Sequence, residues 1–417
     1  MISEIIASPG PTRERLHVPR HIITSEYPPQ PGGVSDYTQL VAEGLAQEGE
    51  EVHVWCPGAA GESISAGGVH VHSGLGRVTP EDLARVGEQL DRFPWPRHIL
   101  VQYVPHGYGY RSMNVPFCFW LWRRARKRGD RVEVMVHEPF HRFAGSWRQY
   151  GAALIHRLMT VILLRAATRV WFSDPQWERR WKPYALGRSI PFQWLPVPSN
   201  IRVVGNEAET QTVRRRYLLD SGLPTEGGGL LVGHFGTYGA PVLSVLEPIV
   251  LTIAREIPGQ PLLLMGINSQ EFRKHLIEQH PPFEKTLFAT GPLAPAELSS
   301  HIAACDLLIQ PYPDGATTRR TSLMVGLSHG KAVVTTSNEE TERVWKDFVP
   351  VGLTLSGDAG AFVQVLRELL DHPEERARMS EAAGKLYQER FDISHTVAEL
   401  RAPASERAAS GSIVCAS

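Results

Sequence analysis

Two segments far apart in the chain combine glycine, hydroxyl and charged residues between an expected strand and an expected helix. Residues 25–37 contain the glycine pair Gly32 and Gly33, and residues 311–322 carry two arginines among several hydroxyl groups. Turns that lead from a strand into a helix bind anions in α/β proteins, because free backbone N–H groups and the helix dipole face the ligand. The two segments therefore predict two α/β domains that face one anionic ligand.

The second segment supplies the cations that a diphosphate would need. Arg319 and Arg320 stand between hydroxyl clusters and directly before an apolar helix. The planar guanidinium of arginine suits bidentate contacts with phosphate. Thr321 and Ser322 would add hydroxyl and backbone donors at the helix start. A solvated surface pair is the alternative interpretation of the two arginines.

Further polar side chains follow expected strands at their carboxyl ends. His137 comes directly after the apolar strand 132–136 and precedes Glu138, while Tyr103 and His106 end another strand. Parallel sheets bind ligands at this edge, so His137 is expected to project into a cleft between the domains. A structural histidine at a strand end is the alternative.

Turn geometry alone also accounts for parts of both segments. Gly32 and Gly33 would serve equally in a tight turn, and Asp314 in an ordinary Pro-Asp-Gly turn. These alternatives stay open at the level of the sequence.

The elements that must position these groups alternate as strand and helix along most of the chain. This rhythm predicts doubly wound parallel sheets, and 417 residues are too many for one hydrophobic core. The predicted organisation is an N-terminal arm (1–19), an N-terminal Rossmann-like domain (20–198), a hinge or linker (199–226), a second, C-terminal α/β domain (227–385), a C-terminal helix packing back on the N-terminal domain (386–401) and a disordered tail (402–417).

Composition narrows the function classes. The formal net charge is −1, which argues against nucleic acid as a partner. The four cysteines are widely spaced and show no metal-ligand or disulfide pattern, and no signal peptide or spanning segment is evident. A cytoplasmic protein without a metal or other cofactor is therefore expected.

Residues 117–128 join four aromatic side chains to five cations. Such a run is typical of a domain helix with a buried aromatic face and a solvated basic end. The alternative is an interfacial anchor, which would place the protein at the inner membrane face and suit a lipid-linked acceptor.

Five segments in order resemble the GT-B-fold glycosyltransferases of the family 4 type. They are residues 27–34, 136–139, 231–236, 263–266 and 306–334, and the resemblance extends over roughly residues 20–400. It implies two Rossmann-like domains around a cleft. It also implies transfer of a sugar from a nucleoside-diphosphate-sugar to an acceptor hydroxyl, with retention of configuration and without a metal. The acceptor would be a small molecule, a glycan or a lipid-linked glycan.

On this interpretation His137 and Glu138 are catalytic, and the other candidates bind substrates. The donor diphosphate is assigned to Gly33, Arg319, Arg320, Thr321 and Ser322, the donor sugar and nucleoside to Asp314, Gly315, Thr317, Thr318, Gly236, Thr237 and Glu339, and the acceptor side to Gly32, Asp36, Tyr37, Tyr103 and His106.

The chain also departs from the family. Members usually carry two glutamates eight positions apart in the donor loop, where this chain has Thr317 and Val325. The arginine and lysine usual after the first donor-domain strand are absent from residues 234–239. Arg319 and Arg320 are expected to replace those cations. A nucleotide-sugar epimerase or hydrolase, or a non-catalytic nucleotide-binding protein, are the alternative functions.

Overall fold

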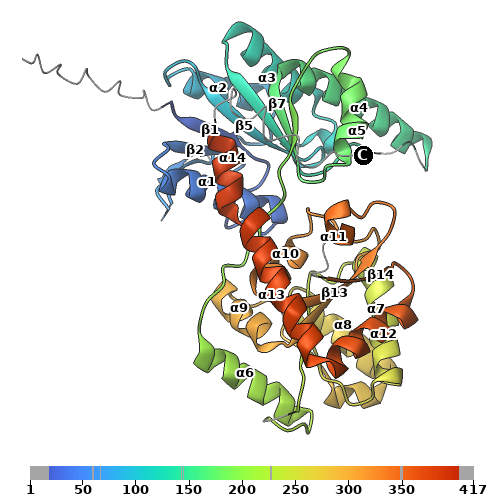
Figure 1. Cartoon of the computed structure of the whole chain (residues 1–417). Helices are drawn as coiled ribbons and strands as arrows, with labels where there is room; N and C mark the ends of the chain where they lie inside the picture. The colour runs from blue at the N-terminus through green and yellow to red at the C-terminus, as the bar shows by residue number, and fades with distance from the viewer. Residues whose placement is uncertain are drawn as a thin grey trace, which may run out of the picture.

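The computed structural model describes residues 18–402 except 59, 60, 66, 142, 144, 226, 227 and 348–350. Two α/β domains lie one above the other in Figure 1. They are joined by residues 195–206, named here the crossing segment, and by the C-terminal helices. Most of the predicted arm and all of the predicted tail after Ala402 lie outside the described residues.

The N-terminal domain is built on an eight-stranded sheet of order β3-β4-β2-β1-β5-β6-β7-β8, in which only β3 is antiparallel to its neighbour. Its strands are β1 (Arg20–Ile23), β2 (Val52–Trp55), β3 (Glu62–Ile64), β4 (His70–His72), β5 (His98–Tyr103), β6 (Arg131–Val136), β7 (Ala167–Phe172) and β8 (Phe192–Trp194). Its helices are α1 (Gly33–Gln47), α2 (Pro80–Leu90), α3 (Val115–Lys127), α4 (Trp147–Ala166) and α5 (Trp177–Trp181), with short 3-10 turns η1 (Tyr110–Ser112) and η2 (Lys182–Ala185).

The C-terminal domain has an all-parallel six-stranded sheet of order β11-β10-β9-β12-β13-β14. Its strands are β9 (Val232–Phe235), β10 (Leu262–Met265), β11 (Leu287–Ala289), β12 (Leu307–Gln310), β13 (Ala332–Ser337) and β14 (Val351–Leu355). Its helices are α6 (Glu207–Asp220), α7 (Ala240–Glu256), α8 (Ser269–Gln279), η3 (Pro281–Lys285), α9 (Pro295–Ala304), α10 (Thr321–Ser328), α11 (Arg343–Asp347), α12 (Ala359–Asp371) and α13 (Pro373–Arg390), and α14 (Ile393–Arg401) follows.

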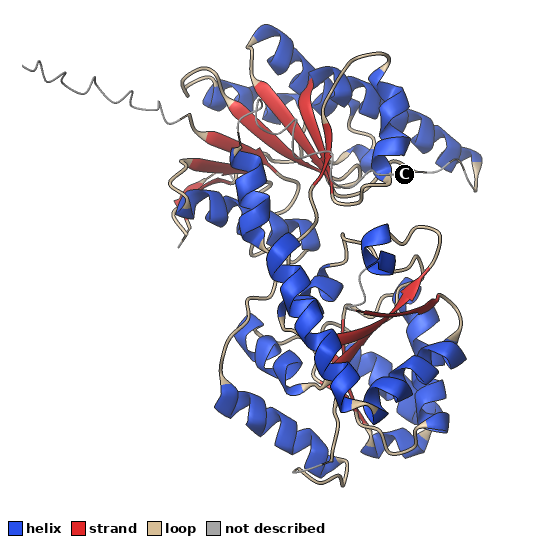
Figure 2. Cartoon of the chain, in the orientation of Figure 1, coloured by secondary structure: helices blue, strands red, loops and turns tan. Residues whose placement is uncertain are grey.

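Both sheets are covered on both faces, as Figure 2 shows, because consecutive residues of their strands are apolar. Ile22 joins the hydrophobic cluster on one face of the N-terminal sheet, and Ile23 joins the cluster on the other. Leu263 and Leu264 divide in the same way between the two clusters of the C-terminal domain. The prediction of two Rossmann-like parallel-sheet domains is therefore confirmed.

Strand order places a switch point in each sheet. In the C-terminal sheet the order reverses between β9 and β12, and in the N-terminal sheet between β1 and β5. Ligands of open α/β sheets bind outside the carboxyl ends of the strands at such points. The glycine segment (25–37) follows β1, and the arginine segment (311–322) follows β12. Each therefore leaves its sheet beside a switch point.

The second half of the predicted linker (199–226) is largely helical and belongs to the C-terminal domain. Residues 207–220 form α6, whose Tyr217 and Leu218 are buried and whose Arg214 forms an ion pair with Asp306 (2.5 Å). These contacts attach α6 to the C-terminal domain.

The chain returns to the N-terminal domain at its end. α13 packs on α10, whereas α14 packs on α1, where Val397 lies close to Gly44. Figure 1 shows these two helices running from one domain to the other. Within the described residues, no helix combines the length and the apolar character needed to cross a bilayer.

Candidate active site

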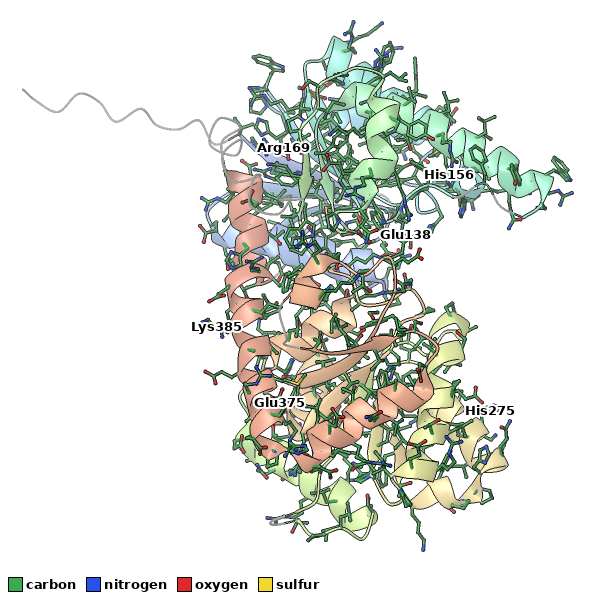
Figure 3. All side chains as sticks on the ribbon, turned by 45° about the vertical axis from the view of Figure 1, so that its right-hand side comes forward. Glu138, His156, Arg169, His275, Glu375 and Lys385 are labelled. Atoms are coloured by element: carbon green, nitrogen blue, oxygen red, sulfur yellow. The ribbon has the colours of Figure 1, made fainter. Side chains whose placement is uncertain are left out.

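A cavity of about 440 Å³ lies between the two domains, at the carboxyl ends of β6, β7, β12 and β13. The N-terminal domain lines it with Glu138, Pro139, Asp174, Trp177 and Arg180, and the C-terminal domain lines it with Pro313, Asp314, Thr317, Arg319, Asn338 and Glu340. In Figure 3 the labelled Glu138 lies at the level where the domains meet. Size, position and polar lining suit a small-molecule site.

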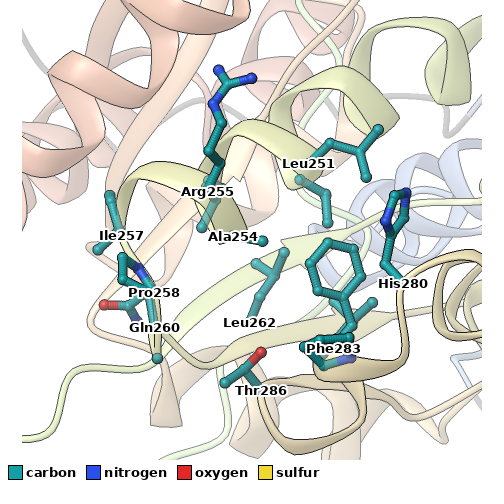
Figure 4. Close-up of a pocket in the computed structure, with 15 residues that line it drawn as sticks. Leu251, Ala254, Arg255, Ile257, Pro258, Gln260, Leu262, His280, Phe283 and Thr286 are labelled. Carbon is teal, nitrogen blue, oxygen red and sulfur yellow. The ribbon is translucent and has the colours of Figure 1, made fainter.

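A second cavity, of about 500 Å³, is shown in Figure 4. It lies at the amino ends of β10 and β11, beside the end of α7, and most of its lining is aliphatic or aromatic. Ligands of parallel sheets bind at the opposite edge, so the interdomain cavity is the better candidate.

The two predicted phosphate-binding arginines lie side by side around one carboxylate. Both Arg319 and Arg320 form ion pairs with Asp314. The guanidinium of Arg319 lies over the ring of Trp177 (5.8 Å), and that of Arg320 over the ring of Tyr312 (4.7 Å). The aromatic rings orient the two planar cations, and Asp314 occupies the position that an anionic ligand would take.

The start of α10 lies next to these arginines. Thr321 is its first residue, and the Ser322 hydroxyl hydrogen-bonds with the buried Tyr312 hydroxyl (2.7 Å). Tyr312 therefore supports both Ser322 and the guanidinium of Arg320. Burial lowers the pKa of Arg320, which nevertheless stays a cation because arginine starts from a pKa above 12.

The two threonines before the arginines have different environments. Thr317 lines the cavity, and its buried hydroxyl has no hydrogen-bond partner among the described residues. Thr318 is fully buried, and its hydroxyl contacts the Ser173 carbonyl (2.9 Å) and Glu342 (2.5 Å). Thr317 thus keeps a hydroxyl for a ligand, whereas Thr318, predicted to bind the donor, attaches the donor loop to the other domain.

Glu342 was not found from the sequence, and its carboxyl group accepts hydrogen bonds from the Thr318 backbone N–H (2.8 Å) and the Trp345 indole (2.6 Å). The Thr318 hydroxyl accepts a hydrogen bond from the Trp194 indole (3.1 Å) and has one proton for two acceptors, Ser173 and Glu342. A proton on Glu342 would let both contacts form at once. Burial raises the pKa of Glu342 to about 8. Burial also raises the pKa of the nearby Asp174.

A contact between the domains closes one side of the cavity. Arg180 donates to the Glu340 carboxylate (2.7 Å), and the Gln176 side chain donates to the Glu340 carbonyl (2.5 Å). Glu339, predicted to contact the donor sugar, is exposed and does not line the cavity. Its neighbour Glu340 faces the N-terminal domain instead, where it pairs with Arg180 and lines the cavity.

His137 lies beside the cavity rather than in its lining. Its Nε2 contacts the Gln102 side-chain oxygen (2.7 Å), and its ring meets Tyr37 edge-on (4.8 Å between centroids). Burial lowers the pKa of His137 to about 3, so the imidazole is neutral at physiological pH. Nε2 donates to Gln102 and leaves Nδ1 as the acceptor.

Glu138 does line the cavity, and its carboxylate lies 3.2 Å from Nδ1 of His106. Tyr103, predicted on the acceptor side, is instead in the hydrophobic core against Tyr108 and Trp181. Side chains alternate along a strand, so Gln102 faces His137 and Tyr103 faces the other way.

The predicted glycine loop holds a carboxylate of the protein itself. Glu26 accepts hydrogen bonds from the backbone N–H groups of Val34 and Ser35 (both 3.0 Å) at the start of α1. A Cβ on Gly32 would lie 2.3 Å from that carboxylate, whereas Gly33 has open space around it. A side chain at position 32 would therefore push the Glu26 carboxylate aside, and a phosphate at Gly33 would have to replace Glu26 at the helix start.

The remaining candidates lie at the cleft edge or in the crossing segment. Asp36 accepts a hydrogen bond from Asn200 (2.7 Å), which attaches α1 to the crossing segment. Gly236 and the exposed Thr237 follow β9 near the switch point but do not line the cavity. Gly315 has φ +74°, and a Cβ there would lie 2.3 Å from the Thr341 hydroxyl, so this turn requires glycine.

Several lining residues were missed from the sequence, and only some left a signal. Asp174 follows the end of β7 by two residues, the pattern that singled out His137. Trp177, Arg180 and Asn338 come together only because the two domains meet. Within the described part of the chain, no group of three histidine, cysteine or acidic side chains is arranged to hold a metal ion.

The architecture has solved counterparts. Sucrose-phosphate synthase from Thermosynechococcus elongatus is 15% identical and matches with a TM-score of 0.67 over 94% of this chain and 100% of that one. The Anabaena HepE structure in complex with UDP is 16% identical, with a TM-score of 0.64 over 94% and 100%. WaaG, a glycosyltransferase of lipopolysaccharide biosynthesis, is 14% identical, with a TM-score of 0.59 over 91% and 99%. The chain has the GT-B fold.

At these identities the likeness establishes the GT-B fold alone. The sequence matches no protein-family model and no curated protein sequence. In this arrangement the cavity lies between the carboxyl ends of strands from both sheets, at β6 and β7 of the N-terminal sheet and at β12 and β13 of the C-terminal sheet, where β12 adjoins the switch point. Its chemistry must be derived from the residues that line it.

Proposed function

We propose that the protein is a glycosyltransferase that moves a sugar from a nucleoside-diphosphate-sugar to an acceptor hydroxyl. The observation that carries this proposal is the arginine pair Arg319 and Arg320, which is held by aromatic rings around the Asp314 carboxylate. Arg319 and Asp314 line the interdomain cavity, whereas Arg320 does not. Two adjacent guanidiniums match the charge and shape of a diphosphate. The structures of Anabaena HepE with UDP and with UDP-glucose support the same ligand class on this fold.

Departure of the diphosphate is the step that these residues would assist. Cleavage of the glycosyl–phosphate bond develops negative charge on the leaving phosphate, and preorganised cations stabilise that charge. The ligand would replace Asp314 between Arg319 and Arg320, while Thr317 would donate its hydroxyl. We propose that these side chains, rather than a divalent ion, neutralise the leaving group.

Retention of anomeric configuration is part of the proposal. The acceptor hydroxyl would attack from the face on which the phosphate leaves, and that phosphate would take the acceptor proton. No strong base is then needed, which suits a neutral His137 beside the cavity. His137 would orient the donor sugar, and Glu138 with His106 would contact the acceptor side.

Product analysis with and without an acceptor tests the proposal. Uridine and adenosine diphosphate sugars are the first donors to screen, since Anabaena HepE has been solved in complex with UDP and with UDP-glucose, and the catalytic domain of Arabidopsis thaliana starch synthase IV with ADP. Thermal shift identifies the bound donor because binding raises the melting temperature. Acceptor-dependent release of nucleoside diphosphate, unaffected by excess EDTA, is the expected result. Product without acceptor would favour an epimerase or hydrolase. Binding without turnover would favour a non-catalytic protein.

A further inference from the structure

Helix α4 is apolar on both of its faces, although only one of them is covered. Ala153, Met159 and Leu163 are buried against the rest of the domain. On the opposite side Trp147, Tyr150, Leu154 and Leu158 advance by three, four and four positions and so form one stripe. A helix that is apolar all round is normally buried on all sides.

The stripe is unusually exposed for such residues. The exposed fractions are 79% for Trp147, 48% for Tyr150, 64% for Leu154 and 50% for Leu158. Phe143, at 49%, lies against Tyr150 with 5.7 Å between ring centroids and lengthens the patch. These five residues are named here the α4 stripe. Figure 3 shows α4, with His156 labelled, reaching out from the edge of its domain.

The surroundings of the stripe are cationic. Residues 139–173 contain five arginines and no aspartate or glutamate, in a chain whose net charge is −1. Arg148 lies over the Trp147 ring (5.5 Å) at the start of the helix. At the other end Arg188 donates to the carbonyls of Leu164 (2.6 Å) and Arg165 (2.7 Å).

The cations at that end belong to two helices and a loop. Arg126, Arg165 and Arg188 are all exposed, and the Arg188 guanidinium reaches the backbone carbonyl of Arg165. Within the described residues, none of the three forms an ion pair with an acidic side chain. The stripe is thus an apolar band with exposed cations at both ends.

We propose that the α4 stripe docks on an anionic lipid surface, with α4 lying in the plane of the interface. Tryptophan and tyrosine favour the headgroup level, leucines the acyl boundary, and arginines at both ends reach lipid phosphates. The stripe extends about 16 Å along the helix, from its rise of about 1.5 Å per residue. It therefore offers several residues to one interface.

A second copy of the chain fits this surface less well. A symmetric pair buries the same patch of both copies, so the arginines around one stripe would face those around the other. A bilayer containing anionic lipid supplies the opposite charge instead. The aromatic and basic run of α3, in which an anchor was the alternative interpretation, is mainly structural: Phe117 and Leu121 are buried, and Arg124 binds Asp130 (2.6 Å).

Docking through α4 also bears on the acceptor, and this step rests on the proposed function. The loop that leads into α4 begins directly after Glu138, which lines the interdomain cavity. A bilayer against α4 would lie on the same side of the N-terminal domain as this loop. The acceptor class that such an orientation favours is a lipid-linked sugar.

Vesicle co-sedimentation of the full chain tests docking without any need for activity. Vesicles of phosphatidylcholine with about 30% phosphatidylglycerol are compared with phosphatidylcholine alone, at low and high salt. The wild type is expected to bind the anionic vesicles, and less so at high salt. The double substitution Leu154→Glu, Leu158→Glu is expected to weaken binding at least about tenfold.

The matched control is Leu219→Glu on α6, which is 60% exposed and lies in the other domain. It should bind vesicles like the wild type, and thermal melting should show that every variant folds. Absence of binding to all vesicles, or binding that the α4 substitutions leave unchanged, would overturn the inference. A wild-type dimer in light scattering that the α4 substitutions dissociate would also overturn it and assign the stripe to self-association. Binding without any transferase activity would contradict the proposed function alone.

Discussion

At the scale of single residues, the candidate site is occupied by carboxylates of the protein itself. Asp314 binds both arginines, and Glu26 binds the free N–H groups at the start of α1. Each carboxylate satisfies donors that would otherwise be unpaired, and Asp314 does so in the lining of the cavity. An anionic ligand must therefore compete with an internal carboxylate, and substitutions of that carboxylate and of its partners should have opposite effects.

The arginine pair gives the first prediction. Arg320→Ala should weaken nucleoside-diphosphate binding by about 1.5–3 kcal/mol, the range for hydrogen bonds to charged groups. Asp314→Asn should strengthen the same binding several-fold, because the competing charge is removed while the side-chain shape is kept. Calorimetry with the donor's nucleoside diphosphate measures both changes. If Asp314→Asn weakens binding instead, Asp314 contacts the ligand directly and does not compete with it.

His137 gives the second prediction. It is neutral, held by Gln102 and placed beside the cavity, so it should act by orienting the donor sugar. His137→Ala should lower kcat by about 10²-fold, the scale of positioning losses, with little change in nucleoside-diphosphate affinity. Gln102→Ala should lower kcat in the same direction but less. Normal turnover in a folded His137→Ala variant would return this histidine to a structural role.

At the scale of elements, the start of α1 offers a matched pair of glycines. Gly32→Ala should displace Glu26 from the helix start and cost about 1–2 kcal/mol of unfolding free energy, the value of a helix cap. Gly33→Ala should be close to neutral, because no atom lies within 4 Å of the added Cβ. Chemical denaturation measures both variants. Equal stability of the two would show that Glu26 does not stabilise this helix.

At the scale of the whole molecule, the protonation of Glu342 makes the contact between the domains depend on pH. Glu342 contacts the Thr318 hydroxyl, which also reaches the Ser173 carbonyl of the N-terminal domain. Its folded pKa of about 8 lies above its ordinary value of 4.5, so the folded state holds a proton that the unfolded state releases. Its stabilising contribution is therefore complete below about pH 4.5 and is lost as the pH rises through about 8. The melting temperature of the wild type should fall over this window more than that of Glu342→Gln. Parallel pH profiles of the two proteins would assign the residue a low folded pKa.

Much of the fold was predictable because it depends on local sequence. Apolar runs such as 99–101 and 262–265 are typical of buried strands when helices alternate with them, and their repetition predicts parallel sheets. Turn residues placed the two loops at strand ends, and Arg319 with Arg320 could be chosen because their charges stand next to each other. Tyr103, predicted on the acceptor side, is buried in the core, whereas its neighbour Gln102 contacts His137, since a strand end does not reveal which of two neighbours faces which side of the sheet.

What the sequence by itself determined is the kind of each domain and the chemistry of its loops. Only the tertiary structure decided that Asp314 lies between both arginines, that Thr318 reaches Ser173, and that Arg180 meets Glu340. Those partners are up to 160 residues apart, so no local period or spacing connects them. The exposed stripe of α4 has the same cause. Apolar residues around a helix predict burial, and only the packing of the whole domain shows which face is left uncovered.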